Sequence, residues 1–198
     1  MNVLGIKGSP RPGSNSTILL EQILAGANAG GADTTLVVPW ELDMQPCIGC
    51  GGCYLTGQCV VKDDFQEVYD LIEAADGLVL ATPVYFGAVS AQAKVLIDRC
   101  ESFWSLRYKL GQDLPPSGRP RLGILVVTAG REEDIMYEGP RITFDFWLRA
   151  CQGEIYGELT EGLLDEKRAV RKNSAIMDQA YAMGRSLAVE LESRATHR

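Results

Sequence analysis

Five short apolar runs alternate with five segments of helical periodicity along this chain of 198 residues, and this alternation constrains the fold more than any other feature. The apolar runs, which predict strands, are residues 2–8, 34–38, 77–82, 122–128 and 154–159. The helical segments are residues 15–29, 63–75, 90–104, 140–151 and 172–193. Near-continuous apolar strands that alternate with helices are typical of a parallel sheet covered on both faces. We therefore expect an α/β three-layer sandwich around a five-stranded parallel sheet.

The strand order that we expect is 2-1-3-4-5, as in flavodoxin-like folds, with the whole chain forming a single domain over residues 1–198. Right-handed crossovers then bring every strand-to-helix loop to the carboxyl edge of the sheet, where ligands of such sheets bind. The loops that reach this edge are residues 8–14, 39–62, 82–89 and 128–139. The second of them has no clear periodicity and is long enough to indicate a functional loop. Residues 105–121, rich in proline and glycine, are expected to be a solvated connection.

Charge and composition exclude several classes of function. The chain has 26 acidic and 19 basic residues and a net charge of -7, so its surface repels nucleic-acid phosphates. It has no apolar stretch of the length of a membrane span and no signal-peptide layout at residues 1–13, so we expect a cytoplasmic protein that does not associate with a membrane. The single histidine, His197, lies near the C-terminus, which argues against histidine-dependent triads and histidine-rich metal sites.

A turn rich in small and hydroxyl residues joins the first strand to the first helix. It reads GSPRPGSNST over residues 8–17. The unpaired N–H groups of a helix N-terminus bind anions, and three serine hydroxyls, an amide and a guanidinium could complete a phosphate cradle. The Walker A pattern is missing, which disfavours ATP or GTP hydrolysis. The GxGxxG fingerprint of dinucleotide binding is missing as well. The alternative is that Ser14 or Ser16 only caps the helix.

The same turn resembles the FMN-phosphate loop of the NAD(P)H-dependent FMN reductase group of flavodoxin-like proteins. Residues 82–87 (TPVYFG) and 90–94 (SAQAK) resemble the second flavin loop of that group and the helix after it. The resemblance covers roughly residues 2–160. It implies an FMN-binding domain in which the phosphate is held by Ser9, Arg11, Ser14, Asn15 and Ser16. The isoalloxazine would be lined by Pro83, Val84, Tyr85, Phe86 and Gly87.

The chemistry of the second loop agrees with this resemblance. A flavin ring needs apolar faces and a few backbone hydrogen bonds at its polar edge, and a Pro-Val-Tyr-Phe-Gly turn supplies both. The alternative is that Tyr85 and Phe86 are ordinary core aromatics at a strand end. A third flavin contact through backbone groups is expected from the loop after the fourth strand, although relatives often have a more glycine-rich loop there. Its residues are Thr128, Ala129 and Gly130.

Four of the six cysteines form a compact C-x2-C-x2-C-x5-C run in the loop at residues 39–62. They are Cys47, Cys50, Cys53 and Cys59. Thiolates at every third residue, separated by glycines, can wrap one cubane, whereas structural zinc usually draws on two separated pairs. A zinc site and a thiol or disulfide redox role remain the alternatives. The isolated Cys100 and Cys151 are expected to be core residues.

Together with the flavin loops, the cysteine run resembles iron-sulfur flavoproteins. That resemblance implies a [4Fe-4S] cluster on these four cysteines, electron transfer between the cluster and FMN, and a homodimer or homotetramer. Chemistry would be carried by the cofactors, so no side chain is assigned a catalytic role. Ferredoxin or NAD(P)H could be the electron donor, and the acceptor would be a small molecule such as oxygen, peroxide, a quinone or an electron-deficient organic compound.

Two other functions fit the sequence. One is an NAD(P)H-dependent FMN or quinone reductase without a cluster, in which hydride passes directly to the flavin. The other is a non-catalytic flavin- or metal-binding module that acts through partners, with residues 172–193 as a contact helix. An amphipathic terminal helix usually covers the sheet instead, which disfavours the second of these functions.

Overall fold

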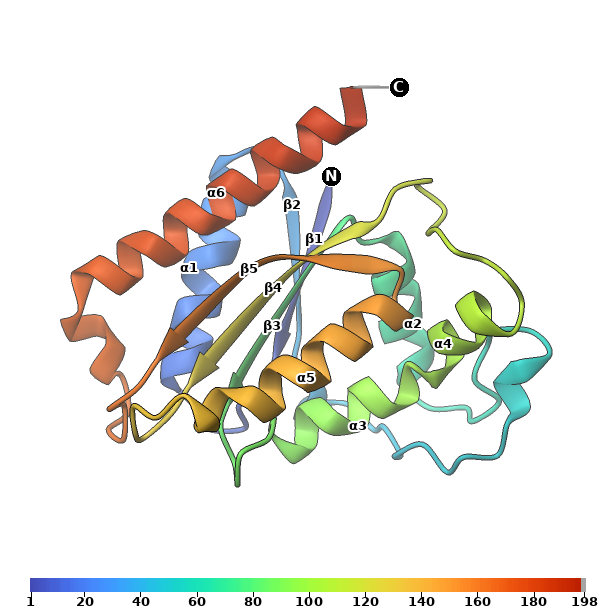
Figure 1. Ribbon diagram of the computed structural model, residues 1–198, viewed down its shortest axis with the longest axis horizontal. Helices are drawn as coiled ribbons and strands as arrows, with labels where there is room; N and C mark the ends of the chain where they lie inside the picture. The colour runs from blue at the N-terminus through green and yellow to red at the C-terminus, as the bar shows by residue number, and fades with distance from the viewer. Residues whose placement is uncertain (197–198) are drawn as a thin grey trace.

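The computed structural model describes residues 1–196, and in these it has the predicted alternation of strands and helices (Figure 1). The strands are β1 (Asn2–Lys7), β2 (Asp33–Val37), β3 (Gly77–Pro83), β4 (Arg121–Thr128) and β5 (Gly153–Glu161). The α-helices are α1 (Asn15–Ala29), α2 (Phe65–Ala74), α3 (Ala91–Arg99), α4 (Glu101–Tyr108), α5 (Ile135–Ala150) and α6 (Ser174–Thr196). Short 3₁₀ turns are η1 (Pro39–Glu41), η2 (Gly52–Tyr54) and η3 (Ala169–Lys172). His197 lies outside the described residues.

The sheet has five parallel strands in the order β2-β1-β3-β4-β5, so the predicted flavodoxin-like topology is confirmed. Helices α1 and α6 cover one face, and α2, α3, α4 and α5 lie on the other (Figure 1). Successive residues of a strand point to opposite faces, and β4 shows the result. Ile124 and Val126 belong to the core beneath α1 and α6, whereas Leu125 and Val127 belong to the core on the opposite face.

Two helix boundaries differ from the prediction. The expected helix over residues 90–104 is split at Cys100, which closes α3 and opens α4 with φ -71° and ψ 7°. Helix α5 begins at Ile135 rather than at Pro140, so the proline lies inside the helix. Periodicity alone does not locate a break between two helices that bury the same face. Pro140, the sixth residue of α5, removes one backbone hydrogen bond without ending the helix.

The prediction of a solvated connection over residues 105–121 is wrong at both ends of that segment. Helix α4 extends to Tyr108, and Arg121 is the first residue of β4 and only 1% exposed. The Arg121 guanidinium donates to the carbonyls of Ile72 and Cys151, at 3.0 and 2.6 Å, where α2 and α5 end. Free carbonyls at helix C-termini attract cations, so tertiary contacts bury this charge at a place that a composition argument assigns to solvent.

Helix α6 packs against α1 at a very short distance because both helices have glycine at the crossing. A Cβ atom on Gly26 would lie 2.0 Å from the Tyr181 carbonyl oxygen, and one on Gly184 would lie 1.9 Å from the Ile23 carbonyl oxygen. The terminal helix therefore covers a face of the domain core, as the sequence indicated. Within residues 1–196, no helix combines the length and the apolar character that crossing a membrane requires.

Candidate functional site

The phosphate-type turn lies between β1 and α1, and its serines are buried. Ser9, Ser14 and Ser16 are 1%, 6% and 0% exposed. Ser14 is the N-cap of α1, because its hydroxyl accepts the Thr17 amide hydrogen at 3.3 Å. The capping alternative thus holds for Ser14 but does not account for Ser9 and Ser16. Buried hydroxyls at a helix N-terminus suit a bound anion, and their part in phosphate binding stays a prediction.

The chain after β5 crosses over this turn and engages Asn15. The Asn15 amide donates to the carbonyls of Leu164 and Glu166 at 3.1 and 2.9 Å, and its oxygen accepts from Val170 N at 3.1 Å. Arg11 also donates to the Asp165 carbonyl, at 3.4 Å. The amide assigned to the phosphate therefore holds residues 164–170 against the start of α1 in this structure. A direct contact between Asn15 and phosphate remains a prediction.

A second arginine stands beside the turn, and sequence reasoning missed it. Arg168 has an exposed side chain, and its Nε lies 3.1 Å from where a Cβ atom of Gly13 would be. Gly13 has φ +66°, so the turn needs glycine for its backbone as well as for this contact. Arg168 lies beyond the part of the chain covered by the family resemblance, and no local motif marks it. Only the packing of the segment after β5 brings it here.

The second predicted flavin loop is a tight turn that presents its aromatics to solvent. Tyr85 and Ala88 exchange backbone hydrogen bonds at 2.9 and 3.0 Å across Phe86 and Gly87, which have φ 51° and 73°. Tyr85 is 46% exposed and the Phe86 side chain is fully exposed. The alternative that these are core aromatics is therefore wrong. An exposed aromatic held at positive φ is typical of a ligand-binding turn.

Backbone groups tie this loop to its neighbours. Val84 N donates to the Thr128 carbonyl at 2.9 Å, and Ser90 N donates to Thr82 Oγ1 at 3.0 Å. The Ser90 hydroxyl caps α3 and donates to the carbonyl of Gly8 in the phosphate-type turn. The Ser90–Gly8 hydrogen bond thus joins the two predicted flavin loops directly.

The third predicted loop uses its backbone within the protein. Ala129 N donates to the Glu161 carbonyl, and the Ala129 carbonyl accepts from Leu164 N, both at 3.0 Å. The space around Gly130 is also taken, because a Cβ atom there would lie 2.2 Å from Asp165 Oδ1. What this loop offers to a flavin therefore stays a prediction.

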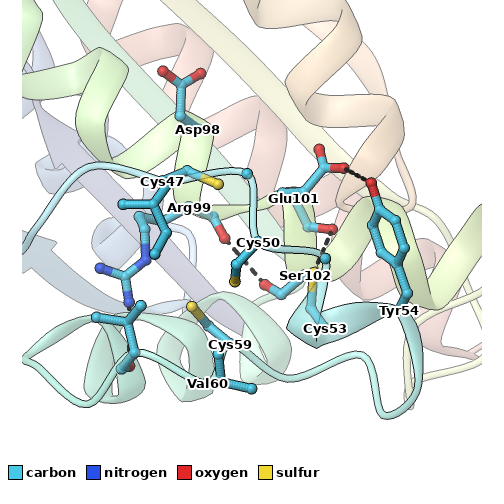
Figure 2. A pocket seen from close by; sticks show the side chains of 14 residues that line it. Cys47, Cys50, Cys53, Tyr54, Cys59, Val60, Asp98, Arg99, Glu101 and Ser102 are labelled. Carbon is cyan, nitrogen blue, oxygen red and sulfur yellow. Dashed lines mark hydrogen bonds between the residues drawn. The ribbon is translucent and has the colours of Figure 1, made fainter.

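The four cysteines of the compact run line one cavity of about 280 Å³ (Figure 2). Cys47 and Cys50 are exposed, Cys59 is half-buried and Cys53 is buried. The glycines between them shape the loop: Gly49 and Gly51 have φ 64° and 68°. Residues from the end of α3 and the start of α4 complete the cavity wall; they are Asp98, Arg99, Glu101 and Ser102.

Cys53 is fixed by contacts with α4. Its thiol donates to the Glu101 carbonyl at 3.8 Å, and its carbonyl accepts from the Ser105 hydroxyl at 2.9 Å. Burial raises the pKa of the Cys53 thiol, and the charges of Glu101, Cys59 and Cys47 raise it further. A metal centre binds the thiolate form, so binding at Cys53 would release this proton.

Four thiols around one cavity are the type of donor that iron-sulfur clusters and zinc both use. Among residues 1–196, no group of three or more Cys, His, Asp or Glu side chains is close enough together to hold one metal ion. A cubane binds each thiolate through a different iron, so its ligands surround a larger body than the four ligands of a tetrahedral zinc. The cysteine cavity offers four thiols, and what they bind stays a prediction.

Arg99 closes the base of the cysteine loop, and sequence reasoning missed it as well. Its side chain is 0% exposed and forms a 2.5 Å ion pair with Asp63. It also donates to the carbonyls of Gln45 and Val61 at 2.7 and 3.4 Å. One guanidinium thus binds the chain just before and just after the cysteine run. A basic residue on the buried face of a predicted helix was the only signal in the sequence.

Helix α3 separates the cavity of the cysteines from the flavin loops. Its N-cap Ser90 touches the phosphate-type turn, whereas Asp98 and Arg99 at its other end line the cysteine cavity. A helix of nine residues is about 14 Å long. Both loops still follow strands at the carboxyl edge of the sheet, and the cysteine cavity lies at the end of α3 away from the phosphate-type turn.

Comparison with known proteins agrees with this arrangement. The chain is 41% identical over 114 residues to an iron-sulfur flavoprotein of Methanocaldococcus jannaschii, a match that spans 56% of this chain and 59% of the relative. It is 37% identical over 122 residues to an iron-sulfur flavoprotein of Methanosarcina thermophila, a match that spans 60% of this chain and 64% of that protein. The aligned part is thus less than two thirds of the length of each of these relatives.

Solved structures show the same fold at low sequence identity. A flavone reductase structure has a TM-score of 0.71 at 15% identity, and the match spans 100% of this chain and 65% of that one. An archaeal flavodoxin has a TM-score of 0.58 at 12% identity over 97% of this chain and 99% of that one. The family model described as NADPH-dependent FMN reductase matches residues 1–133. On this match, which includes both predicted flavin loops and the cysteine run, the chain belongs to the NADPH-dependent FMN reductase family.

Proposed function

We propose that this chain is an FMN-dependent oxidoreductase that transfers electrons between a [4Fe-4S] cluster and FMN. One observation carries the proposal: four cysteines line a single cavity in a chain whose fold also places two flavin-type loops side by side. The names of the relatives above support it. Ferredoxin or NAD(P)H would be the electron donor, and a small molecule would be the acceptor.

The residues of the chain would bind and orient the cofactors. Buried Ser9 and Ser16 would contact the phosphate at the start of α1, with Arg11 and Arg168 supplying positive charge. Exposed Phe86 would cover part of the flavin ring. FMN supplies one- and two-electron chemistry, and a cluster supplies one-electron transfer. No side chain needs to act as a general acid or base.

At the other end of α3, the cysteines would bind the cluster, and the buried side of the cavity at Cys53 would exclude water. Cys53 lies deepest and is held by Glu101 and Ser105, so it would fix the position of the cluster. The glycines between the cysteines would let backbone N–H groups approach the sulfur atoms, and such hydrogen bonds tune reduction potentials.

Anaerobic purification followed by quantitation of iron, acid-labile sulfide and FMN tests the proposal. We expect about four irons, four sulfides and one flavin per chain. Flavin without iron or sulfide under strict anaerobiosis would contradict the proposal.

The Cys53→Ala variant tests the division between the two sites. We expect it to lose iron and sulfide while it keeps FMN, because Cys53 lines the cysteine cavity and the flavin loops lie at the far end of α3. The matched control is Cys151→Ala, a 0% exposed cysteine outside that cavity, which should keep both cofactors. Loss of both cofactors from Cys53→Ala, or of neither, would contradict two separate sites.

An NAD(P)H-dependent FMN or quinone reductase without a cluster is the second candidate function. The separation of the cysteine cavity from the flavin loops along α3 favours it, because direct hydride transfer to a flavin would not involve the cysteines. Rapid oxidation of NADPH by iron-depleted protein supports this function, whereas the electron-transfer function requires the rate to fall when iron is removed.

A further inference from the structure

Two arginines in residues 1–196 are almost completely buried, and they differ at their Nε atoms. Arg99 and Arg121 are each 1% exposed. Arg121 Nε donates to the carbonyls of Ile72 and Ala75, at 3.0 and 3.1 Å. Arg99 Nε is buried and has no hydrogen-bond partner among the described residues. A buried N–H without an acceptor is unfavourable, so Arg99 Nε needs a partner that the hydrogen bonds within the protein do not supply.

The Arg99 side chain borders the cysteine cavity. Arg99 lines that cavity, and Figure 2 shows its guanidinium on the side where Cys59 lies. Burial lowers the pKa of Arg99, but the hydrogen bonds with Asp63 and the negative charge and acceptor sulfur of Cys59 leave it above its ordinary value. Arg99 thus has an orphaned donor in the wall of the cavity that Cys59 also lines.

We propose that Arg99 is a positioning residue for the [4Fe-4S] cluster, whose Nε–H donates to the sulfur of Cys59. This inference rests on the proposed function. Hydrogen bonds to a ligating sulfur and a nearby positive charge stabilise the reduced, more negative cluster and raise its reduction potential. The negative charge of Asp63, which contacts Arg99 on its other side, compensates part of this effect.

The same guanidinium orders the loop that carries the ligands. Its Nη atoms bond the chain at Gln45 and at Val61, on either side of the cysteine run. A test must therefore distinguish a change at the cluster from a loosened loop. A reduction potential serves this purpose, because loss of loop order lowers cluster occupancy without requiring a defined shift of the potential.

The first variant is Arg99→Lys, which keeps the positive charge within reach of Asp63 and removes the Nε–H group. A redox titration monitored by electron paramagnetic resonance measures the cluster potential, and the FMN potential of the same sample is the internal reference. We expect the cluster potential to become more negative and the FMN potential to stay at its wild-type value. An unchanged cluster potential in Arg99→Lys would overturn the proposal.

Asp63→Asn decides the question if Arg99→Lys loses iron. It keeps Arg99 and removes the compensating charge, so we expect a shift in the opposite direction, to a more positive cluster potential. A wild-type potential in Asp63→Asn would then overturn the proposal.

Arg121→Lys is the matched control. Arg121 is as buried as Arg99, but it donates to carbonyls at the ends of α2 and α5 and does not line the cysteine cavity. We expect lower stability to urea and a wild-type cluster potential. A shift equal to that of Arg99→Lys would show a general loosening and overturn the assignment. If the wild-type protein contained no iron and sulfide, the proposed function itself would be overturned. If it contained the cluster but the variants showed unshifted cluster potentials, only the role of Arg99 would be overturned.

Discussion

Phe86 adopts an unfavourable backbone conformation and gains no burial in return. Its φ of 51° lies in the left-handed region, which disfavours residues with a side chain by about 1–2 kcal/mol. Its ring is fully exposed and contributes no apolar contact to the core. Strain of this kind is found where a ligand or partner uses the side chain. The residue is therefore better explained by binding than by folding.

Replacing Phe86 with alanine should separate binding from stability. We expect the free energy of unfolding of Phe86→Ala to stay within about 0.5 kcal/mol of wild type, because the ring buries nothing. We expect weaker FMN binding, because the flavin loses an aromatic face. Urea unfolding and flavin fluorescence titration measure the two quantities.

Phe144 provides the control for that variant. It is 1% exposed, so Phe144→Ala should lower the free energy of unfolding by about 3–5 kcal/mol. If Phe86→Ala unfolded as easily as Phe144→Ala and bound FMN as tightly as wild type, the ring would have a structural role only.

At the level of elements, the cysteine loop takes its shape from glycines that are required for different reasons. Gly57 has φ +74°, and a Cβ atom there would lie 2.0 Å from Leu106 Cδ2 of α4. Gly49 has φ +64°, but a Cβ atom there would meet nothing within 4 Å. Gly57 is thus required by its backbone and by packing, and Gly49 by its backbone alone.

Alanine at these two glycines should therefore have unequal effects. Gly49→Ala should lower the free energy of unfolding by about 1–2 kcal/mol, the strain of a left-handed residue. Gly57→Ala should lower the free energy of unfolding by about 1–3 kcal/mol more than that, because the new Cβ atom overpacks against α4. It should also retain less iron per chain, because the loop shifts away from that helix. Urea midpoints and iron content of the two purified variants test this. Equal losses in both would show that contact with α4 does not position the loop.

At the level of the whole molecule, the outer surface of α5 exposes a row of large apolar side chains. Ile135, Ile142 and Phe146 are 67%, 59% and 71% exposed, and Ile155 on neighbouring β5 is 54% exposed. Large apolar side chains gathered on one face mark interaction surfaces. We propose that this face joins copies of the chain into a homodimer or homotetramer.

A charge placed on that face should dissociate the assembly. We expect Phe146→Glu to have a smaller mass in solution than the wild type, because a carboxylate buried in an apolar contact is strongly unfavourable. Val189→Glu, at a 57% exposed position on α6, should keep the wild-type mass. Light scattering coupled to size-exclusion chromatography measures both. A wild-type mass for Phe146→Glu would exclude this face as the contact.

The sequence predicted the strand and helix alternation, the order of the sheet and the positions of the flavin-type and cysteine loops. These features follow from local patterns: apolar periodicity, glycine-rich turns and the spacing of the cysteines. The break at Cys100 escaped detection because α3 and α4 bury similar faces on either side of it.

The roles of the arginines and of Asn15 were decided only by the tertiary structure. Arg99 meets Gln45 across 54 residues, and Asn15 meets Glu166 across 151 residues. Such polar contacts depend on which backbone carbonyls remain free once the helices and the sheet have packed, and no local pattern encodes that. By itself, the sequence determined the fold and which residue types each loop at the sheet edge contains. The tertiary structure decided which of those residues form hydrogen bonds with the rest of the chain and which remain free for a ligand.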